Sequence, residues 1–190
     1  MENSKNKNQG ILFWVLLTVL IIALGFIISS GLNLAAEIKY KQDISQLSEV
    51  TLKGAADSET CLNLSLSVWN NSIHQTSNKK TDKFTKNNKG KFYSDFNDAL
   101  SKLYKDKDYS NTIDQIKTNR EQALEIMRKL SNPPKKYEKA FEEIKGLYTS
   151  YLDLTNLAIS NSGSYNSVSA DYTSYDAQYA KYYEYIRIYY

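Results

Sequence analysis

The stretch Ile11–Ile28 reads ILFWVLLTVLIIALGFII and contains no charged residue. A helix of this length rises about 27 Å, close to the roughly 30 Å hydrocarbon core of a bilayer. Its two non-aliphatic, non-aromatic residues, Thr18 and Gly25, are both tolerated in membrane helices. We therefore predict a transmembrane helix over residues 11–30 and a single-span membrane protein.

The segment before the span is a short tail, residues 1–10, which carries Lys5 and Lys7. Such a start suits either a cleaved signal peptide or a retained signal anchor. The apolar run is longer than the usual signal core of about 7–15 residues, and no Ala-x-Ala site follows it. Ser29-Ser30-Gly31 is a weak cleavage site. We predict a retained signal anchor, with cleavage as the alternative.

The lysines near the span set its expected orientation. Lys5 and Lys7 on one side balance Lys39 and Lys41 on the other. Because the lysines of the tail lie closer to the span, the positive-inside rule favours a cytoplasmic tail. We predict a single-pass protein of the cell membrane whose residues 31–190 are extracytoplasmic.

The part after the span, residues 31–190, is predicted to be an all-α antiparallel bundle of about four helices. Its length suits one domain, and only two prolines and seven glycines in the chain argue against a turn-rich β protein. Apolar residues recur at helical spacing in four segments. These expected helices are Leu32–Gln75, Phe92–Leu130, Lys135–Ser160 and Ser167–Tyr190.

Two polar stretches are expected to interrupt the second helix. Asp106–Asn111 could break or bend it, and Ser131-Asn132-Pro133-Pro134 ends it, because the residue before a proline avoids the helical region. Short connections of this kind make successive helices antiparallel neighbours.

The connector over residues 76–91 is rich in lysine, with six lysines and Asp82 as its one acidic residue. One interpretation is a solvated, disordered loop. The other is a site for an anionic partner, such as the phosphate groups of a cell-wall polymer or of lipid headgroups. Phe84 is the one aromatic residue in its interior, so we expect no nucleic acid to bind.

The last predicted helix is unusually rich in tyrosine, with nine of the sixteen tyrosines between Tyr165 and Tyr190. A stripe at helical spacing is expected to line the core, with its hydroxyls bonded to Ser and Thr residues of the first helix such as Ser58 and Ser65. The alternative is a face that docks a partner. That stripe comprises Val168, Tyr172, Tyr175, Tyr179, Tyr182, Ile186 and Tyr189.

Six residues are the candidate interaction sites. Three tyrosines fall off the stripe and are expected to be exposed, and three lysines lie early in the connector. They are Tyr183, Tyr185, Tyr190, Lys79, Lys80 and Lys83.

No pattern in the chain indicates catalysis, a cofactor or a metal. The single histidine, His74, lies thirteen residues after the single cysteine, Cys61, about 20 Å along one helix, too far for a nucleophile–base pair. Asp106–Asp114 resembles the start of a calcium loop, but Lys117 stands where the bidentate glutamate belongs. We predict that the protein is not an enzyme.

Several short motifs resemble those of small, uncharacterised, signal-anchored or lipid-anchored helical proteins of Gram-positive bacteria. The resemblance implies a surface-facing helical domain and assigns no activity or catalytic residue. The motifs are Val68-Trp69-Asn70, Asn132-Pro133-Pro134-Lys135-Lys136-Tyr137, Leu147-Tyr148, Asn156-Leu157-Ala158 and Ser162-Gly163-Ser164-Tyr165-Asn166-Ser167.

We expect a membrane protein that presents an extracytoplasmic helical bundle to a protein partner of unknown identity or to a second copy of itself. Two alternatives stay open. One is a sensory or small-ligand-binding bundle, with its ligand between the Ser/Thr-lined first helix and the tyrosine stripe. The other is a structural subunit of a membrane assembly.

Overall fold

A computed structural model of the whole chain describes the backbone of residues 2–160 and 162–190. It describes the side chains of residues 18, 20–22, 33–160 and 162–190. The chain divides into two units, residues 1–41 and residues 42–190, and each is described by itself.

The first helix, α1, runs without a break from Glu2 to Ile73. The predicted transmembrane segment, residues 11–30, forms part of this backbone, but most of its side chains lie outside the described residues. Among the residues that the structure does describe, no helix combines the length and the apolar character that crossing a membrane requires.

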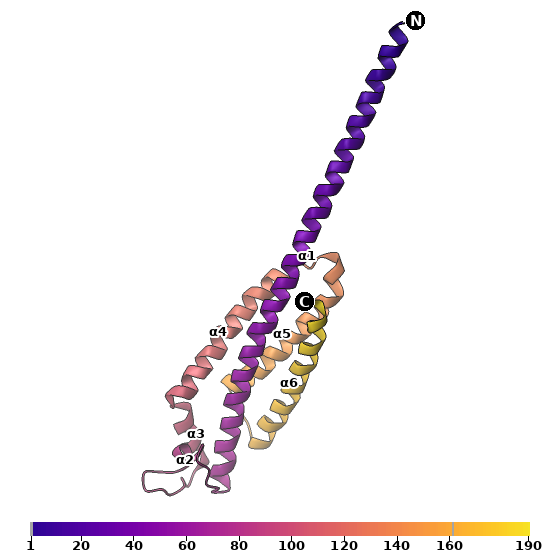
Figure 1. Cartoon of the computed structure of the whole chain (residues 1–190). Helices are drawn as coiled ribbons and strands as arrows, with labels where there is room; N and C mark the ends of the chain where they lie inside the picture. The colour runs from indigo at the N-terminus through magenta and orange to yellow at the C-terminus, as the bar shows by residue number, and fades with distance from the viewer. Residues whose placement is uncertain (1, 161) are drawn as a thin grey trace. The chain divides into compact units, whose positions relative to one another are not determined.

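The second unit is a bundle of four long helices, as predicted (Figure 1). Residues 42–73 of α1 lie beside the other three, and the chain reverses direction from each long helix to the next. Short helices occupy the connections, and no strand occurs among the described residues, so the all-α prediction is confirmed. The remaining long helices are α4 (Lys107–Leu130), α5 (Glu138–Ile159) and α6 (Tyr165–Ile186); the short ones are α2 (Asp82–Thr85), α3 (Phe96–Tyr104), η1 (Lys135–Tyr137) and η2 (Arg187–Tyr189).

The expected helix over Phe92–Leu130 begins later than predicted, at Phe96, and is broken at the polar stretch that was expected to break or bend it. Phe92 pairs with Lys86 in an isolated bridge, and the helical residues divide into α3 and α4. The break falls at the start of the expected polar stretch, because the Asp106 carboxylate accepts hydrogen bonds from the backbone N–H groups of Asp108 and Tyr109. This side chain caps the N-terminus of α4.

Other helix ends follow the sequence signals closely. α4 ends at Leu130, just before the Ser-Asn-Pro-Pro stretch. α6 begins at Tyr165, two residues earlier than predicted, because Ser164 and Ser167 form a reciprocal capping box. α1 ends at Ile73, and Gln75 takes a positive φ of 50° in the turn that follows.

The face that α1 turns toward the bundle is made largely of small residues. Thr51, Ser58 and Ser65 are fully buried there, and Cys61 is nearly so. Gly54 is also buried, and a Cβ atom at this position would collide with the hydroxyl group of Tyr151 on α5. The missing side chain of Gly54 is therefore what allows the Tyr151 ring to pack against α1.

Tyrosine hydroxyls from two other helices and from the C-terminus bond to side chains of α1. Four such pairs connect α1 to α4, to α6 and to the last residue of the chain. They are Ser65–Tyr109 at 2.9 Å, Thr51–Tyr179 at 3.4 Å, Asn63–Tyr172 at 3.1 Å and Ser48–Tyr190 at 2.6 Å.

The predicted tyrosine stripe does face the bundle, but only part of it is fully buried. Tyr179 is 4% exposed, whereas Tyr172, Tyr175 and Tyr182 are half-buried. Ser and Thr residues of α1 do bond tyrosine hydroxyls, as expected, but Ser58 and Ser65 have other partners than the tyrosine stripe. Ser65 bonds Tyr109 of α4, and the Ser58 hydroxyl donates to the Gly54 carbonyl of its own helix.

We expect Gly54→Ala to lower the free energy of unfolding by about 1–3 kcal/mol, because the new methyl group forces the Tyr151 ring to move. Tyr151→Phe should cost less than about 1 kcal/mol, since its buried hydroxyl has no hydrogen-bond partner among the described residues. Urea denaturation of the two single variants and of the double variant measures these losses in the free energy of unfolding. A Gly54→Ala cost that is the same with Tyr or Phe at position 151 would contradict the assignment.

Tyr179→Ala should destabilise the bundle by about 3 kcal/mol, because it removes a buried ring. Tyr185→Ala on the same helix is the matched control, and its side chain is 45% exposed. We expect this variant to lose less than about 1 kcal/mol. Thermal melts that give equal, small losses for both variants would show that the stripe is not part of the core.

Candidate interaction surfaces

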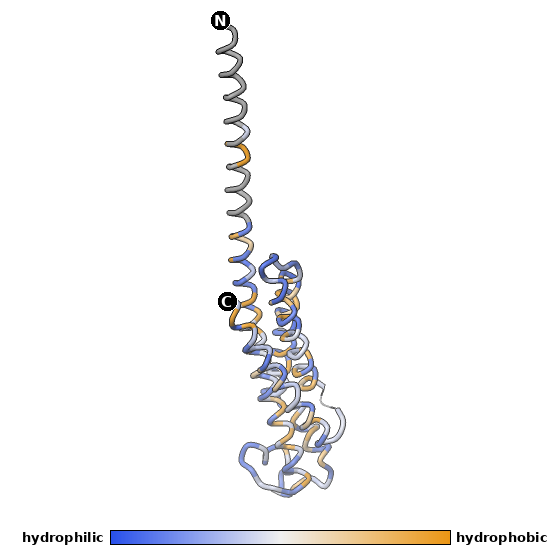
Figure 2. The backbone as a smooth tube through the Cα atoms, turned by 90° about the vertical axis from the view of Figure 1, so that its right-hand side faces the viewer, coloured by the Kyte–Doolittle hydropathy of each residue, from blue (hydrophilic) through white to orange (hydrophobic). Residues whose placement is uncertain are grey.

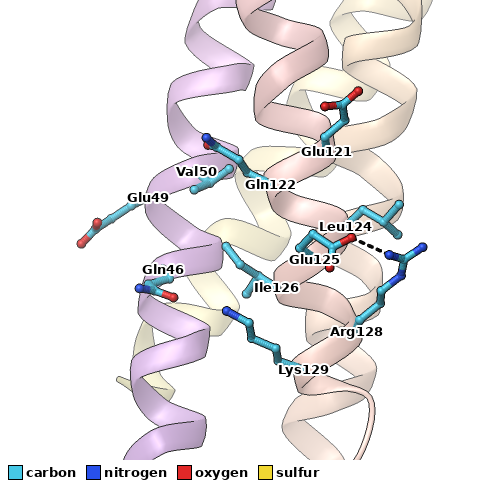
Figure 3. Close-up of a pocket in the computed structure, with 10 residues that line it drawn as sticks. All are labelled: Gln46, Glu49, Val50, Glu121, Gln122, Leu124, Glu125, Ile126, Arg128 and Lys129. Carbon is cyan, nitrogen blue, oxygen red and sulfur yellow. Dashed lines mark hydrogen bonds and ion pairs between the residues drawn. The ribbon is translucent and has the colours of Figure 1, made fainter.

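A hollow with a volume of about 730 Å³ lies along the α1–α4 seam (Figure 3). It is a groove between two helices rather than an enclosed cavity. Its walls come from one turn of α1 and two turns of α4. The lining residues are Gln46, Glu49, Val50, Glu121, Gln122, Leu124, Glu125, Ile126, Arg128 and Lys129.

The groove has an apolar floor and polar edges. Val50 and Ile126 project between the two helices, and the amide of Gln122 lies beside Val50 (Figure 3). Lys129 reaches from α4 toward α1. This composition suits a contact with an amphipathic protein segment, because apolar contact area and hydrogen-bonding edges lie side by side.

The charges of the groove are only partly paired. Arg128 forms an ion pair with Glu125, one turn away on α4. Glu49 and Glu121 are exposed and have no ion pair within the described residues. An exposed ion pair such as Arg128–Glu125 contributes little to stability. Arg128, Glu49 and Glu121 can therefore pair with a partner at little cost to the fold.

A second polar feature lies between α1 and α6, where Glu59 and Asp176 share a side-chain hydrogen bond. Burial raises the pKa of the Glu59 carboxyl above its usual value, and the charge of Asp176 and that hydrogen bond raise it further. The Asn63–Tyr172 bond joins the same two helices.

The three candidate tyrosines have different environments. Tyr183 is half-buried, contrary to the expected exposure, and its ring lies 5.8 Å from that of Tyr179. Tyr190 is 40% exposed, but its hydroxyl bonds Ser48. Tyr185 is exposed as expected, although its ring edge meets Tyr182. The structure therefore does not gather these side chains into one free surface.

The three candidate lysines also divide. Lys83 forms an ion pair of 3.0 Å with Asp106, which joins the connector to the start of α4. Lys79 and Lys80 are exposed, and their ammonium groups have no ion pair within the described part of the chain. The interpretation of the connector as disordered is wrong, because it contains α2 and buries Phe84 and Thr85.

Cys61 is buried in the fold, and Asp114 of the calcium-like stretch is held in an ion pair. Cys61 is 2% exposed, and burial, with a smaller effect from the charge of Asp57, raises the pKa of its thiol to about 11. Asp114, from the calcium-like stretch, pairs with Lys117 on α4. The described residues contain no group of three or more side chains of the metal-binding types.

The space that the small-ligand alternative would use, between the Ser/Thr face of α1 and the tyrosine stripe, is filled by packed rings. Tyr151 and Tyr179 lie 6.4 Å apart there, and Tyr179 bonds Thr51. Sequence reasoning did not identify the α1–α4 groove. The signal that could have found it was the polar pair Gln46 and Gln122 beside apolar Val50 and Ile126 on two adjacent helices.

We expect Glu59→Gln to raise the melting temperature at neutral pH. The folded-state pKa of Glu59 lies above its usual 4.5, so the stability linked to its proton is present below that value and lost as the pH rises through the folded-state pKa. The gain from the substitution should therefore shrink as the pH is lowered toward 4.5. Glu49→Gln, an exposed site on the same helix, is the control, and an equal gain there would contradict the assignment.

Comparison with known proteins found no matching family model, no matching curated protein and no matching solved structure. The resemblance to signal-anchored helical proteins thus stays a prediction. The geometry of the bundle and its surfaces is the basis for any functional conclusion.

Proposed function

We propose that this chain is a single-pass membrane protein that presents a helical bundle outside the cytoplasm as a protein-interaction module. The observation that carries the proposal is the uncharged apolar run Ile11–Ile28 within the unbroken helix α1. The described apolar side chains of that run, Leu20, Ile21 and Ile22, are 57%, 61% and 63% exposed. Removing each such side chain from water is favourable by roughly 1.5–3 kcal/mol, and the lipid of a bilayer provides the apolar surroundings.

The bundle of residues 42–190 is suited to display a fixed surface. Its core is closed by buried leucines, isoleucines and tyrosine rings, and interhelical hydrogen bonds satisfy several hydroxyls. A rigid interface loses less conformational entropy on binding than a mobile one. The α1–α4 groove is the surface we assign to a partner protein, because its floor is apolar and its edges offer amides and charges.

A non-catalytic role is consistent with the chemistry of the bundle. The Cys61 thiol is buried, and burial raises its pKa to about 11, so little thiolate forms at neutral pH. The Glu59–Asp176 pair lies at a helix interface rather than in the groove.

A sensory, small-ligand-binding role is the second candidate. The groove volume of about 730 Å³ lies within the range of about 300–1,000 Å³ typical of ligand sites. A structural role in a membrane assembly is the third candidate and would use the same groove. A ligand would stabilise the isolated protein, whereas an assembly partner would co-purify with it.

The membrane topology can be tested by labelling single cysteines in intact cells with a membrane-impermeant maleimide. Asn88→Cys lies in the exposed connector and should react from outside. Ser4→Cys should react only after the cells are permeabilised. The native chain is the background control, because Cys61 is buried.

Three results would overturn the proposal. Recovery of the protein in the soluble fraction would contradict the assignment of a membrane span. Labelling of position 4 but not 88 in intact cells would reverse the orientation. A Ser4→Cys chain that never labels, together with a mass that lacks the tail, would replace the anchor with a cleaved signal.

A further inference from the structure

We infer that the end of the bundle formed by residues 76–108, called the basic end below, binds a phosphate-bearing polyanion. This segment holds nine lysines and five aspartates, a net charge of +4, whereas the whole chain carries +3. The loops at this end are coloured largely as hydrophilic in Figure 2. The excess charge of the protein is thus concentrated in 33 residues.

The basic end is an ordered structure rather than a solvated tail. Phe84 is 2% exposed and Thr81 is 1% exposed, so α2 and its preceding turn are packed into the fold. The Asn71 side-chain amide of α1 donates to the Thr81 hydroxyl over 2.9 Å. The bridge between Lys86 and Phe92 then closes the loop that follows α2.

Two tight turns hold the backbone at three exposed lysines, Lys80, Lys89 and Lys91. The Asn78 side-chain oxygen accepts from the backbone N–H of Lys80 at 2.9 Å. The Asn87 side-chain oxygen accepts from the backbone N–H groups of Lys89 and Lys91 at 2.9 and 3.1 Å. Gly90 supplies the positive φ of 72° that the second turn needs. Because the backbone is already ordered, binding costs less conformational entropy.

Three of the five aspartates of this end are used within the fold, and Asp98 and Asp108 are exposed. Asp82 accepts from Lys86 and from the Ser77 hydroxyl, and Asp106 pairs with Lys83 while it caps α4. Asp95 caps α3. Six lysines, in contrast, are exposed and have no ion pair in the described part of the chain: Lys79, Lys80, Lys89, Lys91, Lys105 and Lys107.

The chemistry of these cations favours phosphate over carboxylate. The basic end contains no arginine, the residue that recognises a planar carboxylate through two parallel hydrogen bonds. Lysine acts as a point charge, which suits a flexible polymer with repeated phosphates. A lipid surface and a cell-wall phosphodiester polymer both offer this group.

The rings of Phe84, Phe92 and Tyr93 do not form a platform for nucleic-acid bases. The Phe84 ring is buried, and the ammonium groups of Lys86 and Lys102 lie over the rings of Phe92 and Tyr93 at 4.8 and 5.8 Å. Stacked bases need free ring faces. The backbone charge of a polymer is what this surface can recognise.

The test is binding of fluorescein-labelled poly(glycerol phosphate) to the full chain in non-ionic micelles, followed by fluorescence anisotropy. A variant with Lys79, Lys80, Lys89 and Lys91 all changed to glutamine should bind at least about tenfold more weakly in 0.1 M salt, because it loses four phosphate contacts. Its affinity should also depend less steeply on salt concentration.

The matched control changes four exposed lysines of α4, α5 and α6 to glutamine: Lys117, Lys139, Lys145 and Lys181. It removes the same charge and should weaken binding less than about twofold. Circular dichroism melts of both variants check that the fold is kept. Displacement of the polymer by phosphatidylglycerol in the micelles would identify the lipid source, and resistance to it the soluble polymer.

Several results would overturn the inference. Absence of binding by the native chain, or equal loss in both variants, would mean that the basic end has no special role. Tighter binding of poly-glutamate or of single-stranded DNA at equal charge would assign the surface to an acidic protein or to a nucleic acid instead.

Discussion

The bundle depends on the fit of tyrosine rings against the small residues of α1. Gly54, Ser58 and Ser65 leave space on the α1 surface that the rings of Tyr109, Tyr151 and Tyr179 fill. A small residue buries little apolar area itself, so the partner ring must supply it. The hydroxyls that come with these rings are costly to bury unless they are bonded. Hydroxyl side chains on the same face of α1 bond two of these tyrosine hydroxyls. The one helix α1 therefore provides both the space for the rings and the partners for their hydrogen bonds.

This arrangement also explains which side of α1 remains free for contacts. Thr51 and its neighbours are committed to α5 and α6, where Tyr179 closes the interface. On the α4 side, Val50 meets Ile126 across a gap bordered by long polar side chains rather than rings. The groove is therefore a consequence of where the aromatic residues lie. A partner that entered the tyrosine interface would have to break buried hydrogen bonds, whereas the groove requires no such change.

The sequence predicted the helices well and the surfaces poorly, for physical reasons. Apolar spacing and the Pro133-Pro134 stop are local signals. They placed the majority of the ends of α4, α5 and α6 within a few residues of the observed positions. The order of the connector could not be read from composition, because the burial of Phe84 and the Asn71–Thr81 hydrogen bond arise only when the chain folds. Lys83 and Tyr190 were chosen as free groups for the same reason. Their partners, Asp106 and Ser48, lie 23 and 142 residues away in the chain.

The groove and the basic end differ in the physical forces that they offer a partner. The basic end carries unpaired positive charge, whose attraction extends about 10 Å at 0.1 M salt and raises the rate of encounter. The groove acts only at contact, through the burial of Val50 and Ile126 and through its amides. A ligand held by the basic end alone would be exchangeable and sensitive to salt, whereas one held in the groove would be selected by shape. Because the two surfaces share no lining residue, charge at the basic end can change without altering the groove.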